Sequence, residues 1–184
     1  SAFMAFQSVI DMKRKSPRLY VIQAHAKQAQ QFDFQKGDTL QFLEKFDKLI
    51  ADRENRPFLD VLYHQKGLFY DKFKKPNQAV VNYNKSLKAQ SLDKYLLASD
   101  YRNLGEIYFY KAKYQTAGVY YDSTLVLLDN RSREFKAIKK KRDYLVDVIK
   151  YEGIAQRNDS ILNVVGLSES DRVAFYNDYI ENLK

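Results

Sequence analysis

The chain has 184 residues, enough for one domain or at most two small ones. It contains 31 Lys and Arg against 23 Asp and Glu, a formal net charge of +8 at pH 7, and its hydrophobic content of 45% is typical of a globular protein. The absence of cysteine excludes disulfides and thiolate metal sites, and the low numbers of glycine (6) and proline (3) argue against an all-β fold.

The first predicted element is an isolated helix over residues 2–13. It is expected to end before Ser16-Pro17, because the residue before a proline avoids the helical conformation. Residues 18–52 are predicted to form a degenerate helical hairpin with helices over 18–32 and 39–52. Asp38, followed three residues later by Gln41, has the pattern of a capping box at the start of the second helix.

Residues 60–93 and 98–131 are two copies of one pattern. A shift of 38 residues superimposes identical residues: Tyr63 on Tyr101, Gly67 on Gly105, Tyr70 on Tyr108, Ala79 on Ala117, Tyr83 on Tyr121 and Leu87 on Leu125. Each copy has two stripes at helical spacing, separated by a polar turn, which predicts a helix–turn–helix hairpin. We expect the glycine and alanine where the two helices approach closely, with the tyrosines packed in the core on either side.

The same offset of 38 places Ala29 on Gly67 and Phe32 on Tyr70, which is why residues 18–52 are predicted to be a degenerate copy. Downstream the repeat ends. A long helix is predicted from about residue 131 to 156, interrupted near its end by Gly153, and a final helix is predicted to start at Ser168, capped by Ser168 and Asp171. Because stacked repeats need a terminal element over the last apolar face, residues 132–184 are predicted to be C-terminal capping helices.

The segment 131–142 holds most of the surplus positive charge. Its seven basic residues accompany a single acidic one, and three of them are consecutive, so on a helix they spread around the axis instead of forming one stripe. This pattern predicts either a solvated helix face or a basic patch for an acidic partner, an anionic lipid or nucleic acid. The patch residues are Arg131, Arg133, Lys136, Lys139, Lys140, Lys141 and Arg142.

The repeated pattern resembles a known family. Leu104-Gly105-x-x-Tyr108, then Tyr114-x-x-Ala117 and Tyr120-Tyr121, is similar to the tetratricopeptide repeat (TPR) signature. The resemblance implies an all-α fold: three helical hairpins in a right-handed superhelical solenoid, closed by C-terminal capping helices. The chain departs from the family in its offset of 38 instead of 34, and the four extra residues are expected to lengthen the helices around 91–98.

The resemblance also implies a concave groove that binds a protein or peptide partner. The matching positions are His64, Gln65, Leu68, Asp71, Arg102, Asn103, Glu106, Phe109 and Tyr110. Simple surface exposure is the alternative for His64, while Phe109 or Tyr110 is a candidate anchor for a bound peptide. The family's carboxylate clamp of Lys, Asn and Arg is not expected, because only Asn103 fits it.

No residue pattern predicts an enzyme. The only histidines are His25, expected to be structural, and His64, and neither has a neighbouring group that completes a metal site or a nucleophile–base pair. The sequence therefore predicts no catalytic residue, no metal site and no cofactor. It predicts a non-enzymatic protein–protein interaction scaffold, with a purely structural segment of a larger protein as the alternative.

A narrower resemblance covers residues 63–184 and rests on sequence stretches such as AGVYYDSTLVLLD and LSESDRVAFYNDYI. These stretches are similar to the TPR lipoproteins of Bacteroidetes called SprE or PorW. The resemblance implies a fragment of a larger periplasmic protein, anchored to the outer membrane through a lipidated cysteine upstream, although a cytoplasmic location stays open. The implied role is support of type IX secretion and gliding motility, with components of that machinery as partners.

Overall fold

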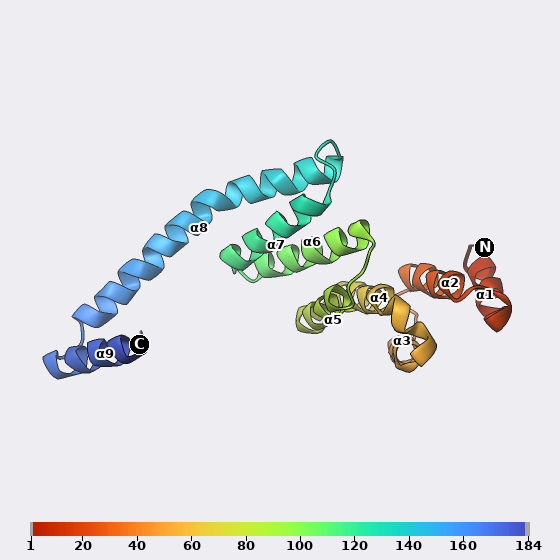
Figure 1. The fold of residues 1–184 in the computed structure, drawn as a ribbon, viewed down its shortest axis with the longest axis horizontal. Helices are drawn as coiled ribbons and strands as arrows, with labels where there is room; N and C mark the ends of the chain where they lie inside the picture. Colours follow the sequence, from red (N-terminus) through yellow and green to blue (C-terminus); the bar gives the residue numbers. More distant parts are fainter. Residues whose placement is uncertain (1, 183–184) are drawn as a thin grey trace. The chain divides into compact units, whose positions relative to one another are not determined.

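The computed structural model describes residues 2–182, and within that range every regular element is a helix and there is no β-strand (Figure 1). The all-α class predicted from the sequence is confirmed. The chain divides into two compact units, one up to residue 140 and one from residue 141. The boundary falls inside a single long helix, α8 (Arg133–Val165), which contributes its first turns to the first unit.

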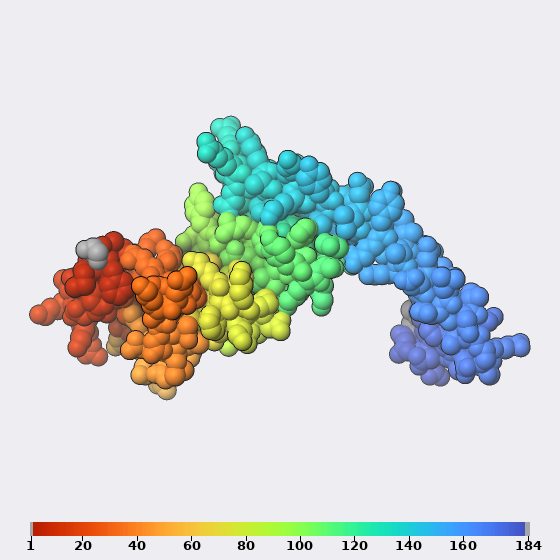
Figure 2. All heavy atoms as spheres, turned by 180° about the vertical axis from the view of Figure 1, so that it is seen from behind, coloured from red at the N-terminus to blue at the C-terminus, as the bar shows by residue number. Residues whose placement is uncertain are grey.

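The first unit is a series of short helices connected by tight turns. In chain order these are α1 (Ala2–Asp11), η1 (Lys13–Lys15), α2 (Arg18–Gln30), α3 (Thr39–Ala51), η2 (Arg53–Phe58), α4 (Leu59–Lys72), α5 (Pro76–Lys88), α6 (Lys94–Tyr110) and α7 (Tyr114–Leu127). The space-filling view shows their side chains, coloured red to green, packed into one continuous body (Figure 2). The predicted repeats coincide with the pairs α4–α5 and α6–α7.

Both pairs are held by the same contact between a glycine and a tyrosine. A Cβ atom added at Gly67 of α4 would lie 2.5 Å from the ring of Tyr83 on α5, and one added at Gly105 of α6 would lie 2.6 Å from the ring of Tyr121 on α7. Both tyrosines are fully buried. The glycines are therefore required because each helix backbone rests directly on an aromatic ring. The sequence predicted the close approach at the glycines but placed the tyrosines on either side of it.

The turns inside the two pairs are also copies of one another. Lys74 and Ala112, 38 residues apart, both adopt a left-handed conformation, with φ of 58° and 55°. In each turn the following backbone N–H donates to a carbonyl five residues earlier, over 2.8 and 2.9 Å, which closes the end of the first helix. The first helix is longer in the second pair than in the first pair: α6 has 17 residues and α4 has 14.

The N-terminal helices pack differently from the two pairs. The helices predicted over 18–32 and 39–52 are present as α2 and α3, and Asp38 caps α3 by accepting a hydrogen bond from the Gln41 N–H at 2.9 Å. However, α2 packs against α1 and α4, whereas α3 packs against α4 and η2, and the backbones of α2 and α3 make few close contacts with each other. This differs from the close hairpin expected at 18–52.

Phenylalanines fill the space where these N-terminal helices meet α4. The Phe42 ring of α3 stacks on Phe69 of α4 at 4.2 Å between ring centroids, and Phe32, from the loop after α2, packs edge-on against both rings at 5.0 and 5.3 Å. Ile22, Phe46 and Leu62 complete this buried cluster. The sequence is apolar enough here to build a core without the glycine–tyrosine contact.

The second unit consists of the remainder of α8 and of α9 (Glu169–Asn182). The helix predicted to be interrupted at Gly153 instead runs through it to Val165, because a glycine in a helix costs only about 1 kcal/mol and the hydrogen bonds continue on both sides. The predicted cap of the last helix is present, since Ser168 Oγ accepts from the Asp171 N–H at 3.2 Å. Both helices contribute exposed apolar side chains to this unit, among them Ile161, Val173 and Tyr179.

We expect alanine to destabilise the protein at two of its glycines and to stabilise it at a third. Gly67→Ala and Gly105→Ala should each lower the free energy of unfolding by about 1–3 kcal/mol, because the new methyl group overlaps a buried ring. Gly153→Ala is the matched control: nothing lies within 4 Å of its added Cβ, so the better helix former should stabilise by up to about 1 kcal/mol. Urea unfolding followed by circular dichroism measures all three, and equal effects would contradict the close approach.

Candidate functional site

The structure places the predicted groove residues in two different environments. His64 and Gln65 on α4 are buried, with 8% and 5% of their surface exposed, so they do not line an open surface. His64 Nδ1 instead forms a hydrogen bond of 2.6 Å with Oδ1 of Asp100 on α6. The prediction of groove contact or surface exposure for these two residues is therefore corrected: they belong to the interior between the two repeats.

Asp100 is the most enclosed carboxylate of this interior. It has no exposed surface, and its second oxygen, Oδ2, has no hydrogen-bond partner within the described residues. Burial raises the pKa of the Asp100 carboxyl, and the hydrogen bond and charge of His64 oppose that rise. Nearby, the Ser86 hydroxyl donates to the carbonyl of Asp60 at 2.9 Å. These hydrogen bonds form a buried polar contact between α4, α5 and α6.

Three further predicted groove residues, all on α6, are engaged within the chain. Arg102 forms an ion pair with Glu134 of α8. Asn103 Nδ2 donates to the Tyr83 hydroxyl at 3.2 Å, and the Tyr121 hydroxyl donates to Oε1 of Glu106 at 3.1 Å. These side chains therefore fix α6 to α5, α7 and the start of α8.

Asp71 and Tyr110 are brought together on one surface cavity. It has a volume of about 560 Å³ and lies at the C-terminal ends of α4 and α6, and we call it the Asp71–Tyr110 cavity. Tyr110 is 83% exposed. The remaining lining residues are Lys72, Lys74, Pro76, Ile107 and Lys111. Burial raises the pKa of the Asp71 carboxyl, and the charge of Lys74 opposes this.

The last two predicted groove residues, Leu68 and Phe109, do not line this cavity. Leu68 is partly buried and packs against the core cluster that contains Tyr83 and Leu104. Phe109 is 38% exposed, and its ring makes edge-on contacts with the rings of Tyr110 and Tyr114. Phe109 therefore supports Tyr110, which is the more accessible of the two predicted anchors.

Sequence reasoning missed the lysines of this cavity. Lys72, Lys74 and Lys111 fall in the polar turns, which the repeat pattern treats as connections between helices. The available signal was their position: each lies at or just beyond the last turn of α4 or α6, where a cation interacts favourably with the helix C-terminus. Lys111 also donates to Oδ1 of Asn77 at 2.7 Å, which links the two repeats at this edge.

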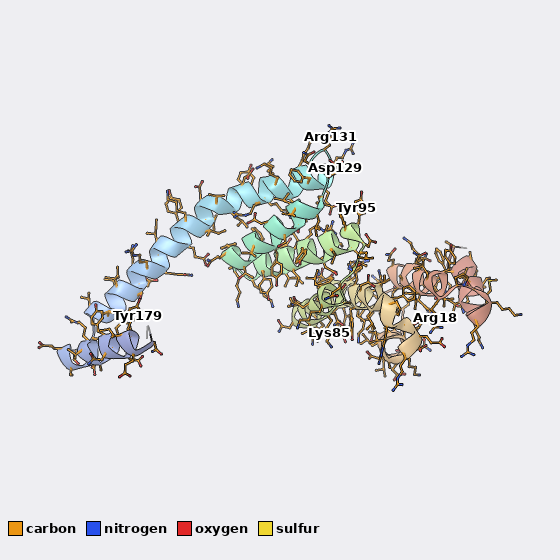
Figure 3. The ribbon with its side chains drawn as sticks, viewed as in Figure 1. Arg18, Lys85, Tyr95, Asp129, Arg131 and Tyr179 are labelled. Carbon is orange, nitrogen blue, oxygen red and sulfur yellow. The ribbon has the colours of Figure 1, made fainter. Side chains whose placement is uncertain are left out.

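The predicted basic patch lies on the loop before α8 and on the first turns of α8. Arg131, labelled in Figure 3, is on the loop, next to Asp129. All members are exposed except Arg142, which is partly exposed. Glu134, within the same segment, pairs with Arg102, which joins the first turn of α8 to α6.

His25 is structural, as its position in α2 predicted. The ring is 7% exposed and its Nδ1 atom has no hydrogen-bond partner among the described residues. Burial, assisted by the positive charges of Lys45 and Arg18, lowers the pKa of His25 from 6.5 to about 4. Residues 2–182 contain no group of three or more His, Cys, Asp or Glu side chains placed to hold a metal ion, and none of their helices is long and apolar enough to cross a membrane.

The buried pair of His64 and Asp100 should be energetically coupled, so that removal of one partner costs the stability of the other. We expect Asp100→Leu to cost about 3 kcal/mol of unfolding free energy, because it leaves His64 buried without its partner. Leucine fits this environment in the other repeat, where Leu62 occupies the equivalent position with no exposed surface. His64→Leu with Asp100→Leu should therefore cost less than the two single changes added together. Additive costs in a double-mutant cycle would contradict a coupled pair.

Acid should destabilise the protein through His25. Because the folded state lowers the His25 pKa from 6.5 to about 4, the unfolded state binds more protons between these values, and stability falls as pH falls through that window. The loss should approach about 1.4 kcal/mol per pH unit. Asp71 and Asp100, with raised pKa values, act in the opposite direction, so the measurement is the difference between wild type and His25→Gln in urea unfolding at several pH values. Parallel curves for the two proteins would contradict a neutral buried histidine.

Comparisons with known proteins identify no relative of this chain among the families and curated proteins searched. A search against protein-family models finds no match, and a search of curated proteins finds none with significant similarity. The candidate site is thus defined by the chain's own residues, with the Asp71–Tyr110 cavity and the basic patch as its two exposed parts. The resemblances to TPR proteins and to SprE or PorW stay predictions.

Proposed function

We propose that the chain forms a TPR-like right-handed solenoid, with residues 60–131 as its two regular repeats, and that its function is to bind another protein. The observation that carries this proposal is the repetition, at one offset of 38 residues, of both the glycine–tyrosine contact and the left-handed turn. A helical pair that repeats in this way buries its apolar face only by stacking on its neighbour, which is the principle of a solenoid. Such a scaffold presents an extended surface and needs no catalytic group.

The partner surface that we propose is the Asp71–Tyr110 cavity. Tyr110 combines a large apolar ring with a hydroxyl group and is 83% exposed, which is typical of an interface anchor. The three lysines around it favour a partner segment with acidic residues next to an apolar side chain. His64, Gln65, Arg102 and Asn103 do not line this cavity, so they are not part of the proposed partner surface.

For the biological setting we propose the role implied by the narrower resemblance. The chain would then be part of an outer-membrane-associated periplasmic lipoprotein, and the partner a component of the type IX secretion or gliding machinery. Only the similarity of residues 63–184 to SprE or PorW supports this setting. Identification of the partner tests it separately from the binding surface.

Two observations favour alternative functions. The exposed basic residues of 131–142 are compatible with an adaptor for nucleic acid or anionic lipid, whose binding would weaken steeply with salt. The ion pair between Arg102 and Glu134 shows that a predicted groove residue is already occupied by this chain, as expected for a purely structural segment. The experiment below separates both from the scaffold.

The scaffold proposal predicts a protein cross-link that depends on position. A photoreactive phenylalanine at Tyr110 should give one discrete cross-linked product in envelope extract, because this side chain projects from the cavity. Tyr95 is the matched control, since it is 77% exposed and lies at the opposite end of the same helix (Figure 3). The double change Lys72→Glu and Lys74→Glu should weaken the Tyr110 product.

Each alternative gives a different result. Equal products from positions 95 and 110, or no product from either, would contradict the cavity as the partner surface. Binding that survives the lysine changes but is lost with salt or with Lys139, Lys140 and Lys141 all changed to Glu would move the site to the basic patch. Mass spectrometry of a discrete product shows whether it is a secretion or motility component.

A further inference from the structure

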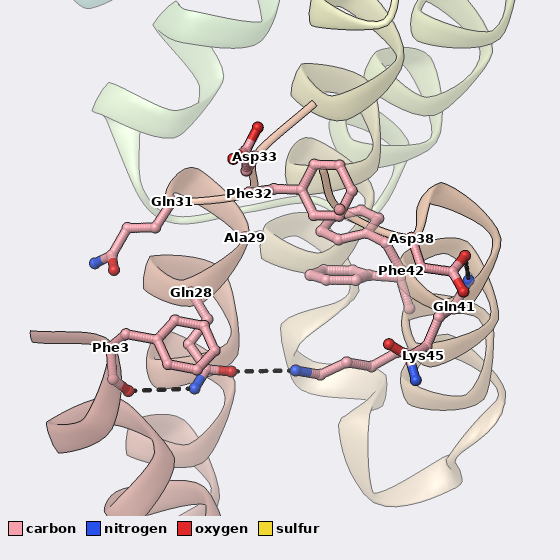
Figure 4. A pocket seen from close by; sticks show the side chains of 12 residues that line it. Phe3, Gln28, Ala29, Gln31, Phe32, Asp33, Asp38, Gln41, Phe42 and Lys45 are labelled. Carbon is pink, nitrogen blue, oxygen red and sulfur yellow. Dashed lines mark hydrogen bonds between the residues drawn. The ribbon is translucent and has the colours of Figure 1, made fainter. Parts of the chain in front are cut away.

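A second cavity lies between α2 and α3, away from the proposed partner surface. Figure 4 shows the two helices standing apart, with side chains from both directed into the space between them. The cavity has a volume of about 310 Å³, which falls at the lower end of the range of small-molecule sites. Side chains of α1 and of the loop 31–38 also line it.

The sequence explains why this pair of helices is open. In the two repeats a three-residue turn and a glycine draw the helices together, whereas α2 and α3 are joined by the eight-residue segment 31–38, and Ala29 replaces the glycine. Phe32 from this loop inserts beside Phe42 and Phe69, with ring-centroid distances of 5.0 and 5.3 Å, so it holds the open arrangement from one side. The space left between the helices is part of the fold.

Phenylalanines form the apolar part of the cavity wall. Phe3 of α1, Phe32, Phe42 and Phe46 all line it, and Phe42 and Phe46 are stacked at 4.7 Å between ring centroids. Ala29 and Gly37 are the small residues that line the cavity, and Ala29 stands at the position where each repeat has the glycine of its closest helix contact. Such a wall suits a flat aromatic or branched apolar group.

One cation, Lys45, enters the cavity from α3. It is half-buried, and its Nζ atom makes a hydrogen bond of 3.2 Å with Oε1 of Gln28 on α2 (Figure 4). Within residues 2–182, no carboxylate lies within ion-pair distance of this ammonium group. Burial lowers the pKa of Lys45, which is the expected cost of a cation without an anion beside it.

Gln28 holds the polar end of the cavity in a fixed orientation. Its side chain is 95% enclosed, and its Nε2 donates to Oε1 of Gln7 at 3.0 Å and to the Phe3 carbonyl at 3.4 Å, which leaves Oε1 toward Lys45. The ammonium group of Lys45 has three donors, and this single acceptor satisfies one of them. The site is therefore built to present a cation with unused donors.

The two acidic residues that line the cavity do not neutralise Lys45. Asp33 and Asp38 are both exposed to solvent. Oδ1 of Asp33 accepts from the backbone N–H groups of Gln35 and Lys36, and Oδ1 of Asp38 accepts from the Gln41 N–H as the cap of α3. Their charges are screened by water and engaged with the backbone, whereas the charge of Lys45 is partly withdrawn from water.

We propose that the cavity between α2 and α3 binds a small organic acid with an aromatic or branched apolar body. The carboxylate pairs with the Lys45 ammonium group, and the apolar body lies among Phe3, Phe32, Phe42 and Phe46. Charge complementarity supplies one part of the recognition, and the four phenylalanines supply the apolar part. This site is independent of the proposed protein-binding surface and would exist whether or not that surface does.

Phenylacetate is the test ligand, and phenylacetamide is its uncharged counterpart. In isothermal titration calorimetry with the full chain, we expect phenylacetate to bind and phenylacetamide to bind at least roughly tenfold more weakly, because only the acid offers an anion to Lys45. Acetate, which lacks the apolar body, should also bind more weakly. Equal affinity for acid and amide, or no binding of phenylacetate at millimolar concentration, would overturn the proposal.

Three variants locate the site. Lys45→Met should weaken phenylacetate binding at least roughly tenfold, while Lys48→Met, an exposed change on the same helix, should leave it unchanged. Ala29→Leu should abolish binding by filling the cavity, and thermal unfolding confirms that each variant is folded. Unchanged binding in Lys45→Met or in Ala29→Leu would place the ligand elsewhere and overturn the assignment. Binding confined to peptides that end in phenylalanine would overturn the free-acid class.

Discussion

The first unit depends on how closely two helix backbones can approach a buried tyrosine ring. Gly67 and Gly105 allow α4 and α6 to rest on Tyr83 and Tyr121, and nothing larger than a hydrogen atom fits between. The tyrosine hydroxyls then reach polar partners on α6, Asn103 for Tyr83 and Glu106 for Tyr121. In these two repeats, one contact thus sets both the spacing of the helices and the positions of the polar side chains.

A second constraint connects successive repeats. Positions 64 and 102 are equivalent in the 38-residue pattern, and each carries a nitrogen base or cation that reaches a carboxylate on a later helix: His64 reaches Asp100, and Arg102 reaches Glu134. The two links differ in burial, since the first is enclosed and the second is partly exposed. The repeat therefore conserves the direction of the link between neighbours, while the chemistry of the link changes with its access to water.

The sequence predicted those features that depend on local spacing. The glycine–tyrosine contacts, the turns and the caps at Asp38 and Ser168 each involve residues whose types and separations are visible in the chain. The burial of His64 was not predictable, because Asp100 has Leu62 at its repeat-equivalent position and no pattern indicates the pair. The separation of α2 and α3 also escaped prediction, since it depends on how the 31–38 loop folds back onto Phe69. Long-range packing of this kind leaves no period in the sequence.

The short distance along the chain between contacting residues has a consequence for folding. Gly67 and Tyr83, like Gly105 and Tyr121, are separated by a single tight turn, so each pair can close early and with little loss of chain entropy. By contrast, the contact between α2 and α4 joins helices that are separated along the chain by α3 and its flanking segments. The order of assembly would then run from the middle of the chain toward its N-terminus, and the aromatic cavity between α2 and α3 would be the last part of the first unit to take shape.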